Sequence, residues 1–169
     1  DNNVNSNDKA LVYDSFVTMV LKEVQEKTGL DPYNDGLTIE TTIDSKAQQR
    51  LYDIVNTNDY IQYVNDKIQN AVVMLDTKTG AVRAVNGGRK QTTLLGYNRA
   101  TDNSRSTGST IKPVIDYGPA IEYLNYSTGQ TIMDQRTTYS NGVELNNWDF
   151  SHKGAMTLRT ALVYSRNTT

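Results

Sequence analysis

The sequence contains no cysteine and a single histidine, His152. The lack of cysteine excludes disulfide bonds, thiolate metal sites and a catalytic thiol within these 169 residues. One histidine cannot build a multi-histidine metal site, and a Ser-His-Asp triad would depend on it alone. Because Ser151, Lys153 and Gly154 surround it, we interpret His152 as a loop residue.

Long apolar runs and basic clusters are also missing. No stretch is long enough to span a bilayer and no signal-peptide pattern is present, so any membrane anchor is expected outside these residues. The formal net charge is -2, and no run of Lys or Arg exceeds two, which argues against nucleic acid as a partner. Hydrophobic residues make up 37% and charged residues 21%, so a folded core is expected.

Apolar periodicity and turn residues predict a chain of mixed helices and strands. The polar, Asn-rich residues 1–9 are interpreted as a linker or frayed terminus. Helices are expected over 10–28, after a cap at Asp44, after Ser109 and over 156–164; a half-buried strand over 37–43; a β-hairpin over 71–85; and loops over 87–108 and, with short extended pieces, over 125–153.

The first chemical motif is a Ser-x-x-Lys tetrad, Ser109 to Lys112. On a helix this spacing places the hydroxyl and the amine on one face. A lysine can deprotonate a serine only if burial or nearby cations lower the pKa of its amine, and Ile111 and Val114 make burial plausible. The tetrad therefore predicts a nucleophile beside its base.

The tetrad alone is weak evidence, because ten serines and nine lysines give about half a match by chance. A second copy does occur, from Ser6 to Lys9, in the polar N-terminal segment. We dismiss this copy because no apolar face accompanies it.

The second motif is the Ser-x-Asn sequence Ser165, Arg166, Asn167, which follows a predicted helix. In serine acyl-transfer enzymes without a catalytic histidine, such a loop supplies a second hydroxyl and an amide that binds substrate and lysine. A helix that simply ends in Ser and Asn is the alternative interpretation.

Two longer stretches surround these motifs and carry a family resemblance. Residues 97–100 and 105–113 closely resemble the nucleophile region of class A penicillin-binding proteins of the Gram-positive type. The sequence that leads up to and includes the second motif also resembles this family, in residues 147–149, 158–162 and 165–167. The resemblance is strong over 71–169 and looser over 37–56.

The resemblance implies an α/β fold of the penicillin-binding and serine β-lactamase type, with a mainly antiparallel sheet flanked by helices and an all-α subdomain. Residues 1–65 would be a small α+β linker after an upstream glycosyltransferase domain. Residues 66–169 would be the first half of the transpeptidase domain. The remainder of that domain, as a second chain or a missing segment, is therefore an expected partner.

The activity implied is that of a peptidoglycan D,D-transpeptidase acting through a serine acyl-enzyme. Ser109 would attack the D-Ala-D-Ala end of a stem peptide, with Lys112 as base, and β-lactam antibiotics would acylate the same serine. Ser165 and Asn167 would be both catalytic and substrate-binding, and Trp148 would bind substrate. No metal or organic cofactor is implied, and the site would lie on the extracellular face of the cytoplasmic membrane, anchored by a transmembrane helix outside this chain.

The family also has a third motif, Lys-Thr-Gly or similar, which follows Ser-x-Asn on a strand lining the active site. In this chain Lys78-Thr79-Gly80 has that sequence but precedes Ser109, which is a departure from the family. We interpret it as a hairpin turn. The true third motif is then expected outside this chain.

Two other functions remain open from the sequence. A serine β-lactamase or β-lactam sensor shares the three motifs, and it would differ in the lifetime of its penicillin adduct. A wall-binding or scaffolding module with a degenerate site is the non-enzymatic alternative.

Overall fold

The computed structural model of the chain describes residues 6–169. They form two compact units, the first ending at Ser104 and the second spanning Arg105–Thr169. The predicted boundary between linker and transpeptidase, at residues 65 and 66, lies inside the first unit and stays a prediction.

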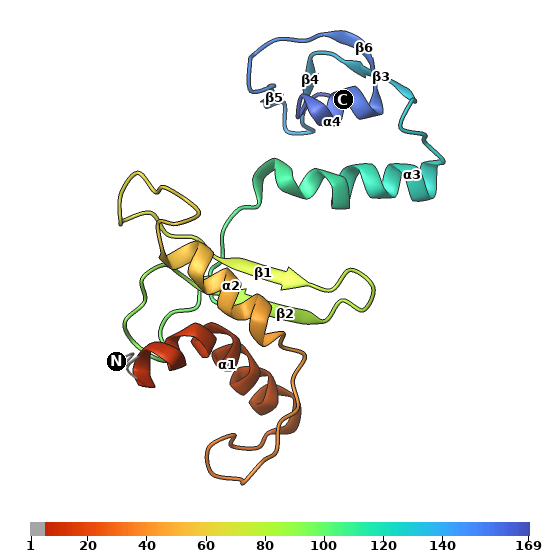
Figure 1. Cartoon of the computed structure of the whole chain (residues 1–169). Helices are drawn as coiled ribbons and strands as arrows, with labels where there is room; N and C mark the ends of the chain where they lie inside the picture. Colours follow the sequence, from red (N-terminus) through yellow and green to blue (C-terminus); the bar gives the residue numbers. More distant parts are fainter. Residues whose placement is uncertain (1–5) are drawn as a thin grey trace. The chain divides into compact units, whose positions relative to one another are not determined.

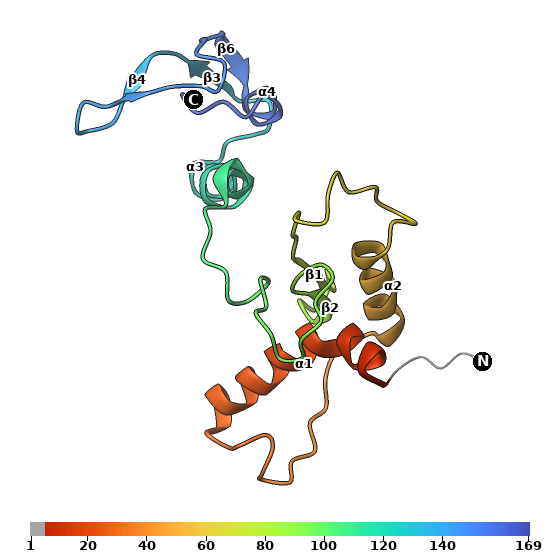
Figure 2. The ribbon, with the colours of Figure 1, turned by 90° about the vertical axis from the view of Figure 1, so that its left-hand side faces the viewer.

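The first unit is a β-hairpin with two helices packed against it (Figures 1 and 2). Strands β1 and β2 pair antiparallel, and helices α1 and α2 both contact β2. The elements are α1 (Ser6–Thr28), α2 (Ser45–Asn56), β1 (Val72–Leu75) and β2 (Val82–Asn86). The buried apolar side chains between them are Val12, Phe16, Val55, Ala84 and Val85.

Two aspartates start these local structures, and the sequence predicted the first of them, the cap at Asp44. The Asp44 side chain accepts hydrogen bonds from the backbone N–H groups of Lys46 and Ala47 and so caps α2. The Asp76 side chain accepts from two N–H groups of the hairpin turn, and Gly80 completes that turn with a positive φ of 71°. Lys78-Thr79-Gly80 is therefore a turn in this chain and does not lie on a strand.

A buried glutamine joins the helices to the hairpin. Gln48 on α2 donates to the carbonyl oxygens of Val12 on α1 and Val85 on β2, at 2.7 and 2.8 Å. Its own carbonyl oxygen accepts from the Val85 N–H at 2.8 Å. Because β2 pairs with β1 on one side only, Gln48 satisfies backbone groups that the sheet leaves unpaired.

The second unit begins with a continuous helical run whose hydrogen-bonding pattern changes twice. It continues into two small antiparallel sheets and a short helix. The elements are the 3₁₀-helix η1 (Gly108–Ile111), the π-helix η2 (Pro113–Tyr117), α3 (Gly118–Leu124), β3 (Thr131–Asp134), β4 (Thr137–Thr138), β5 (Glu144–Leu145), β6 (Gly154–Thr157) and α4 (Leu158–Val163).

Three predictions of secondary structure were wrong in part or in whole. The first helix begins at Ser6, so the predicted linker 1–9 is helical from that residue on, while residues 1–5 lie outside the described part. The predicted strand over 37–43 does not form, because within the described residues this segment is hydrogen-bonded to β2 only through Thr42 and builds no ladder. The last helix begins at Leu158, since Met156 is paired in β6.

Apolar side chains are exposed on both units. All four residues of β1 are exposed, and so are several from the helical run after Ser109, where Val114 is 68% exposed. Among the described residues, no helix is both long and apolar enough to cross a bilayer.

Replacing Gln48 with leucine tests its joining role. Gln48→Leu should lower the free energy of unfolding by on the order of 3 kcal/mol, because it leaves the buried N–H and carbonyl of Val85 without partners. Gln49→Leu on the exposed face of the same helix is the control and should change it little. Urea denaturation measures both, and equal effects would show that the hydrogen bonds of Gln48 are dispensable.

Candidate active site

The amine of Lys112 binds the Ser-x-Asn loop (residues 165–167), which lies far from it in the sequence. Lys112 Nζ donates to the carbonyl oxygens of Ser165 at 3.0 Å and Arg166 at 2.7 Å, and to Asn167 Oδ1 at 2.6 Å. Ser165 Oγ lies 3.4 Å from the same nitrogen. The structure therefore brings together three of the four predicted catalytic residues.

The shape of the Ser-x-Asn loop follows from how α4 ends. Ser165 adopts a left-handed conformation with φ 51°, directly after the helix. The Ser165 N–H donates to the Leu162 carbonyl and the Arg166 N–H to the Ala161 carbonyl, which is a Schellman motif with serine where glycine is usual. This turn reverses the chain and presents two successive carbonyl oxygens to Lys112.

The amide group of Asn167 is fixed on both sides. Its Nδ2 donates to the Asn146 carbonyl at 2.8 Å, which leaves Oδ1 to accept from Lys112. The Asn167 backbone N–H donates to Asn147 Oδ1 at 2.7 Å. One N–H of the amide remains for a further acceptor, since the group carries two.

Ser109 lies at the start of the same helical run as Lys112. Its carbonyl accepts from the Lys112 backbone N–H, and its exposed hydroxyl makes no hydrogen bond to any described residue. Gly108 precedes it with φ 55°, a conformation that favours glycine and turns the chain sharply into the helix. The predicted contact between hydroxyl and amine is therefore not made here, because the amine points to the Ser-x-Asn loop.

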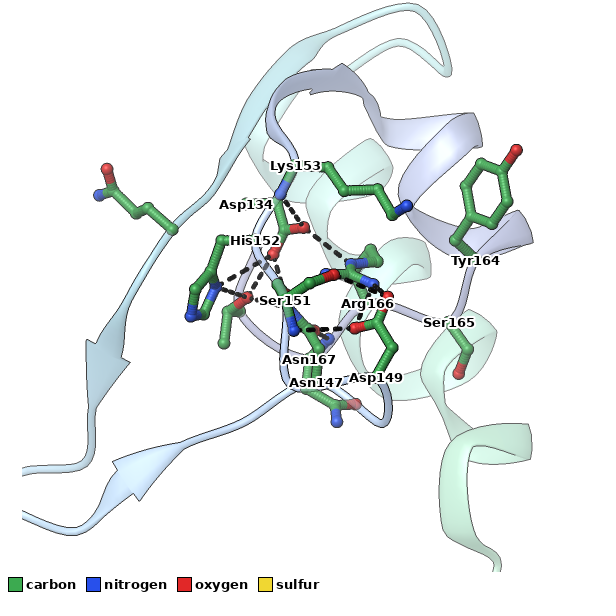
Figure 3. Close-up of polar contacts among 12 residues, drawn as sticks. Asp134, Asn147, Asp149, Ser151, His152, Lys153, Tyr164, Ser165, Arg166 and Asn167 are labelled. Carbon is green, nitrogen blue, oxygen red and sulfur yellow. Dashed lines mark hydrogen bonds and ion pairs between the residues drawn. The ribbon is translucent and has the colours of Figure 1, made fainter.

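Behind this loop, the side chain of Arg166 is buried between two carboxylates (Figure 3). Its Nε donates to Asp134 Oδ2 at 2.7 Å, and its Nη1 lies 3.0 and 2.9 Å from the two oxygens of Asp149. Its Nη2 donates to the Ser151 carbonyl. We call Asp134, Asp149 and Arg166 the arginine clamp; in Figure 3 the Ser165 side chain points away from it.

The surroundings shift the pKa values of both carboxyl groups of the clamp downward. Burial by itself would raise the pKa of Asp134, but hydrogen bonds from Thr168, Asn147, the Lys153 backbone and Arg166 outweigh it and lower the pKa to about 2. Hydrogen bonds from Arg166 hold the pKa of Asp149 well below its usual range, although burial opposes them. The clamp is therefore ionised at neutral pH.

Lys112 has its pKa lowered from the usual value. Burial is the main cause, the carboxylate of Asp116 opposes it, and the guanidinium of Arg166 lowers the pKa further. This is the direction that a lysine needs to serve as a base.

A cleft of about 920 Å³ opens beside these groups within the second unit. Lys112, Arg166 and Asn167 line it together with tyrosine and aliphatic side chains. Trp148 borders the Ser-x-Asn loop, because its indole N–H donates to the Tyr164 carbonyl at 3.1 Å while 68% of the residue is exposed. Within the described part of the chain, no group of three metal-binding side chains could hold an ion.

Sequence reasoning missed the arginine clamp. In the sequence, residues 147–149 are marked only by the family resemblance, and the Ser-x-Asn pattern leaves its middle residue unspecified. Asp134 gave no signal, since its place depends on the pairing of β3 with β6, where it lies opposite Gly154.

Comparison with known proteins identifies the family. The model of the penicillin binding protein transpeptidase domain matches residues 70–169. Penicillin-binding protein 1A/1B of Bacillus subtilis is 44% identical over 155 residues, covering 92% of this chain and 17% of the relative. Penicillin-binding protein 1A of Streptococcus pneumoniae is 37% identical over 158 residues, covering 91% and 22%.

A solved structure of the penicillin-binding protein PonA1 from Mycobacterium tuberculosis matches with a TM-score of 0.70 and 28% identity, over 91% of this chain and 39% of that one. A second, of PonA1 in complex with penicillin V, matches with a TM-score of 0.65 and 27% identity, over 91% and 40%.

The chain belongs to the penicillin-binding protein transpeptidase family, and its fold is that family's mixed α/β fold with antiparallel sheets. Its similarity to the 1A and 1A/1B proteins confirms the class A, Gram-positive type. The chain spans 17% and 22% of the length of these two curated relatives.

The lowered pKa of Asp134 predicts acid sensitivity. A carboxylate with a folded-state pKa of about 2 and an ordinary value of 3.8 stabilises the fold above pH 3.8 and loses this contribution as the pH falls toward 2. Asp134→Asn should flatten the fall in unfolding free energy across this window. Denaturation at several pH values measures the slope, and an unchanged slope in the variant would contradict the assignment.

Proposed function

We propose that this chain carries the nucleophile and the second motif of a peptidoglycan D,D-transpeptidase, in which Ser109 becomes acylated. The observation that carries the proposal is the convergence of the Ser-x-Asn loop on Lys112, three residues after Ser109 in one helical run. Membership of the transpeptidase family and the PonA1 complex with penicillin V support it.

The proposed reaction begins with the neutral form of Lys112. An ammonium group has three N–H donors, and the loop offers it three close acceptors. Once the amine loses a proton, only two N–H groups remain and the lone pair must avoid the third acceptor. The lone pair can then take the proton of the Ser109 hydroxyl, which lies on the preceding turn.

Bond making and breaking then follow the chemistry of acyl transfer. Ser109 Oγ bonds to the carbonyl carbon of the penultimate D-Ala, and the bond from that carbon to the nitrogen of the terminal D-Ala breaks. Ser165 Oγ, 3.4 Å from the amine, relays the proton to the leaving nitrogen. An amine of a neighbouring stem peptide attacks the ester and restores the serine.

Other groups would bind rather than react. The Ser109 N–H lies in the first turn of the helical run, where N–H groups have no helical partner, and would stabilise the oxyanion. The free N–H of Asn167 would hold the substrate's backbone. Trp148 would supply an exposed aromatic wall beside the loop.

The protein would act on the extracellular face of the cytoplasmic membrane, together with a glycosyltransferase domain and an anchor in other segments. We also propose that later segments of the transpeptidase domain cover the apolar side chains of β1 and of the run after Ser109. Their exposure supports this, since an uncovered apolar patch marks an interaction surface.

Removal of the nucleophile is the direct test. Ser109→Ala should abolish covalent labelling of the full-length protein by a fluorescent penicillin and leave thermal unfolding unchanged, because only a small exposed hydroxyl is lost. Ser6→Ala, in the other Ser-x-x-Lys sequence, should label like the parent. Persistent labelling of Ser109→Ala would refute the proposal, and a short-lived parent adduct would indicate a β-lactamase instead.

Lys112→Arg tests the base. A guanidinium group keeps its proton near neutral pH, so the acylation rate should fall at least 1,000-fold although the positive charge remains. Stopped-flow acylation by a chromogenic β-lactam measures the rate. Acylation close to the parent rate would show that another group takes the serine proton.

A further inference from the structure

Arg166 holds the Ser-x-Asn loop from the side opposite to Lys112. Its carbonyl oxygen faces the Lys112 amine at 2.7 Å, while its side chain runs into the interior and is only 1% exposed as a residue. The same residue therefore connects the reactive face of the loop with the arginine clamp behind it (Figure 3).

We infer that Arg166, held by Asp134 and Asp149, is a positioning residue for the transpeptidation site: it fixes the Ser-x-Asn loop in the conformation that directs its oxygen atoms at Lys112. This inference rests on the proposed function. It adds Asp134 and Asp149, which lie outside both motifs, and gives a role to Arg166, the unspecified middle residue of Ser-x-Asn.

The Ser-x-Asn loop contains a strained residue. Ser165 has a left-handed conformation with φ 51°, which is costly for a residue with a side chain. Such conformations persist where the surroundings over-determine them. The clamp supplies this restraint one residue later, because a guanidinium with three bound nitrogen atoms cannot rotate freely.

The arginine clamp also joins segments that are separate in the sequence and lie around the loop. Asp134 ends β3, whereas Asp149 and Ser151 lie in the connection between β5 and β6. The Thr168 hydroxyl donates to Asp134 Oδ1, and Asn147 Nδ2 donates to the same oxygen at 2.8 Å. Residues on both sides of Asn167 are thus tied to one buried carboxylate.

The Arg166 guanidinium group also matches the geometry of its acceptors. Two carboxylates and a carbonyl surround the guanidinium, and each takes a different edge of it. Lysine has the same charge, but its donors share one nitrogen atom, so it cannot reach acceptors that are spread around the edges of a planar guanidinium. Position 166 therefore requires arginine, and charge alone is not sufficient.

The test compares Arg166→Lys with the parent in the natural full-length protein. The second-order rate of acylation by a fluorescent penicillin should fall on the order of 100-fold, the size of effect expected when reacting groups lose their alignment. Arg159→Lys is the matched control on α4: among the described residues the exposed Arg159 side chain hydrogen-bonds only to Thr128, so the variant should acylate like the parent.

The pH profile separates positioning from simple loss of stability. Asp116 and Arg166 are the charged groups that act on the Lys112 amine, and the Arg166 cation lowers its pKa. Arg166→Gln should therefore move the acid limb of acylation to higher pH, whereas Arg166→Lys keeps the charge and the limb. If Arg166 only stabilised the fold, the Arg166→Lys variant would contain less active protein but would acylate at the parent's rate per active site at every pH.

Each outcome decides the inference. A folded Arg166→Lys variant that acylates within twofold of the parent overturns it. If that variant shows no cooperative unfolding transition, Asp149→Asn decides, since it keeps the shape of the clamp: a tenfold or larger slowing supports the inference, and an unchanged rate overturns it. Labelling of Ser109→Ala would instead remove the proposed function itself, so the two failures are distinguishable.

Discussion

The buried guanidinium of Arg166 is the constraint on which the second unit depends. A charge taken out of water is costly unless counter-charges and hydrogen bonds surround it, and here two carboxylates and a carbonyl do so. Because Asp134 and Asp149 come from different segments, the requirement to pair one cation fixes where β3 ends and where the connection between β5 and β6 runs. Local propensity in these short elements is too weak to do this, since β4 and β5 have two residues each.

The buried arginine clamp orders the side of the Ser-x-Asn loop that contacts Lys112. The Ser-x-Asn loop has a strained left-handed residue at one end and a fixed amide at the other, with Arg166 between them. Lys112 then meets acceptors whose positions are already set, so its side chain gains three hydrogen bonds without having to order the loop itself.

Sequence reasoning succeeded where a structure is determined by neighbouring residues. Asp44 predicts the start of α2, and Gly80 predicts the hairpin turn. Both predictions succeed because a cap and a turn each involve residues only a few positions apart. It failed for residues 37–43, since alternating side chains show that a segment could be a strand but not whether a partner is present. The two motifs predict that Lys112 contacts the Ser-x-Asn loop. The role of Asp134 cannot be predicted in this way, because its position depends on the long-range pairing of β3 with β6 and no local sequence pattern indicates it.

The structure also shows why the Ser109 hydroxyl and the Lys112 amine are not in contact. Two influences on Lys112 oppose each other: burial and Arg166 favour the neutral amine, while three oxygen acceptors suit an ammonium, which has a proton for each. With all three contacts made, the amine has no free lone pair for the Ser109 hydroxyl. In the mechanism proposed, loss of one proton releases one acceptor, and the lone pair that appears is the group that serine requires. In that mechanism, the same loop binds the ammonium form of Lys112 through three oxygen atoms and loses one of these contacts when the amine becomes neutral.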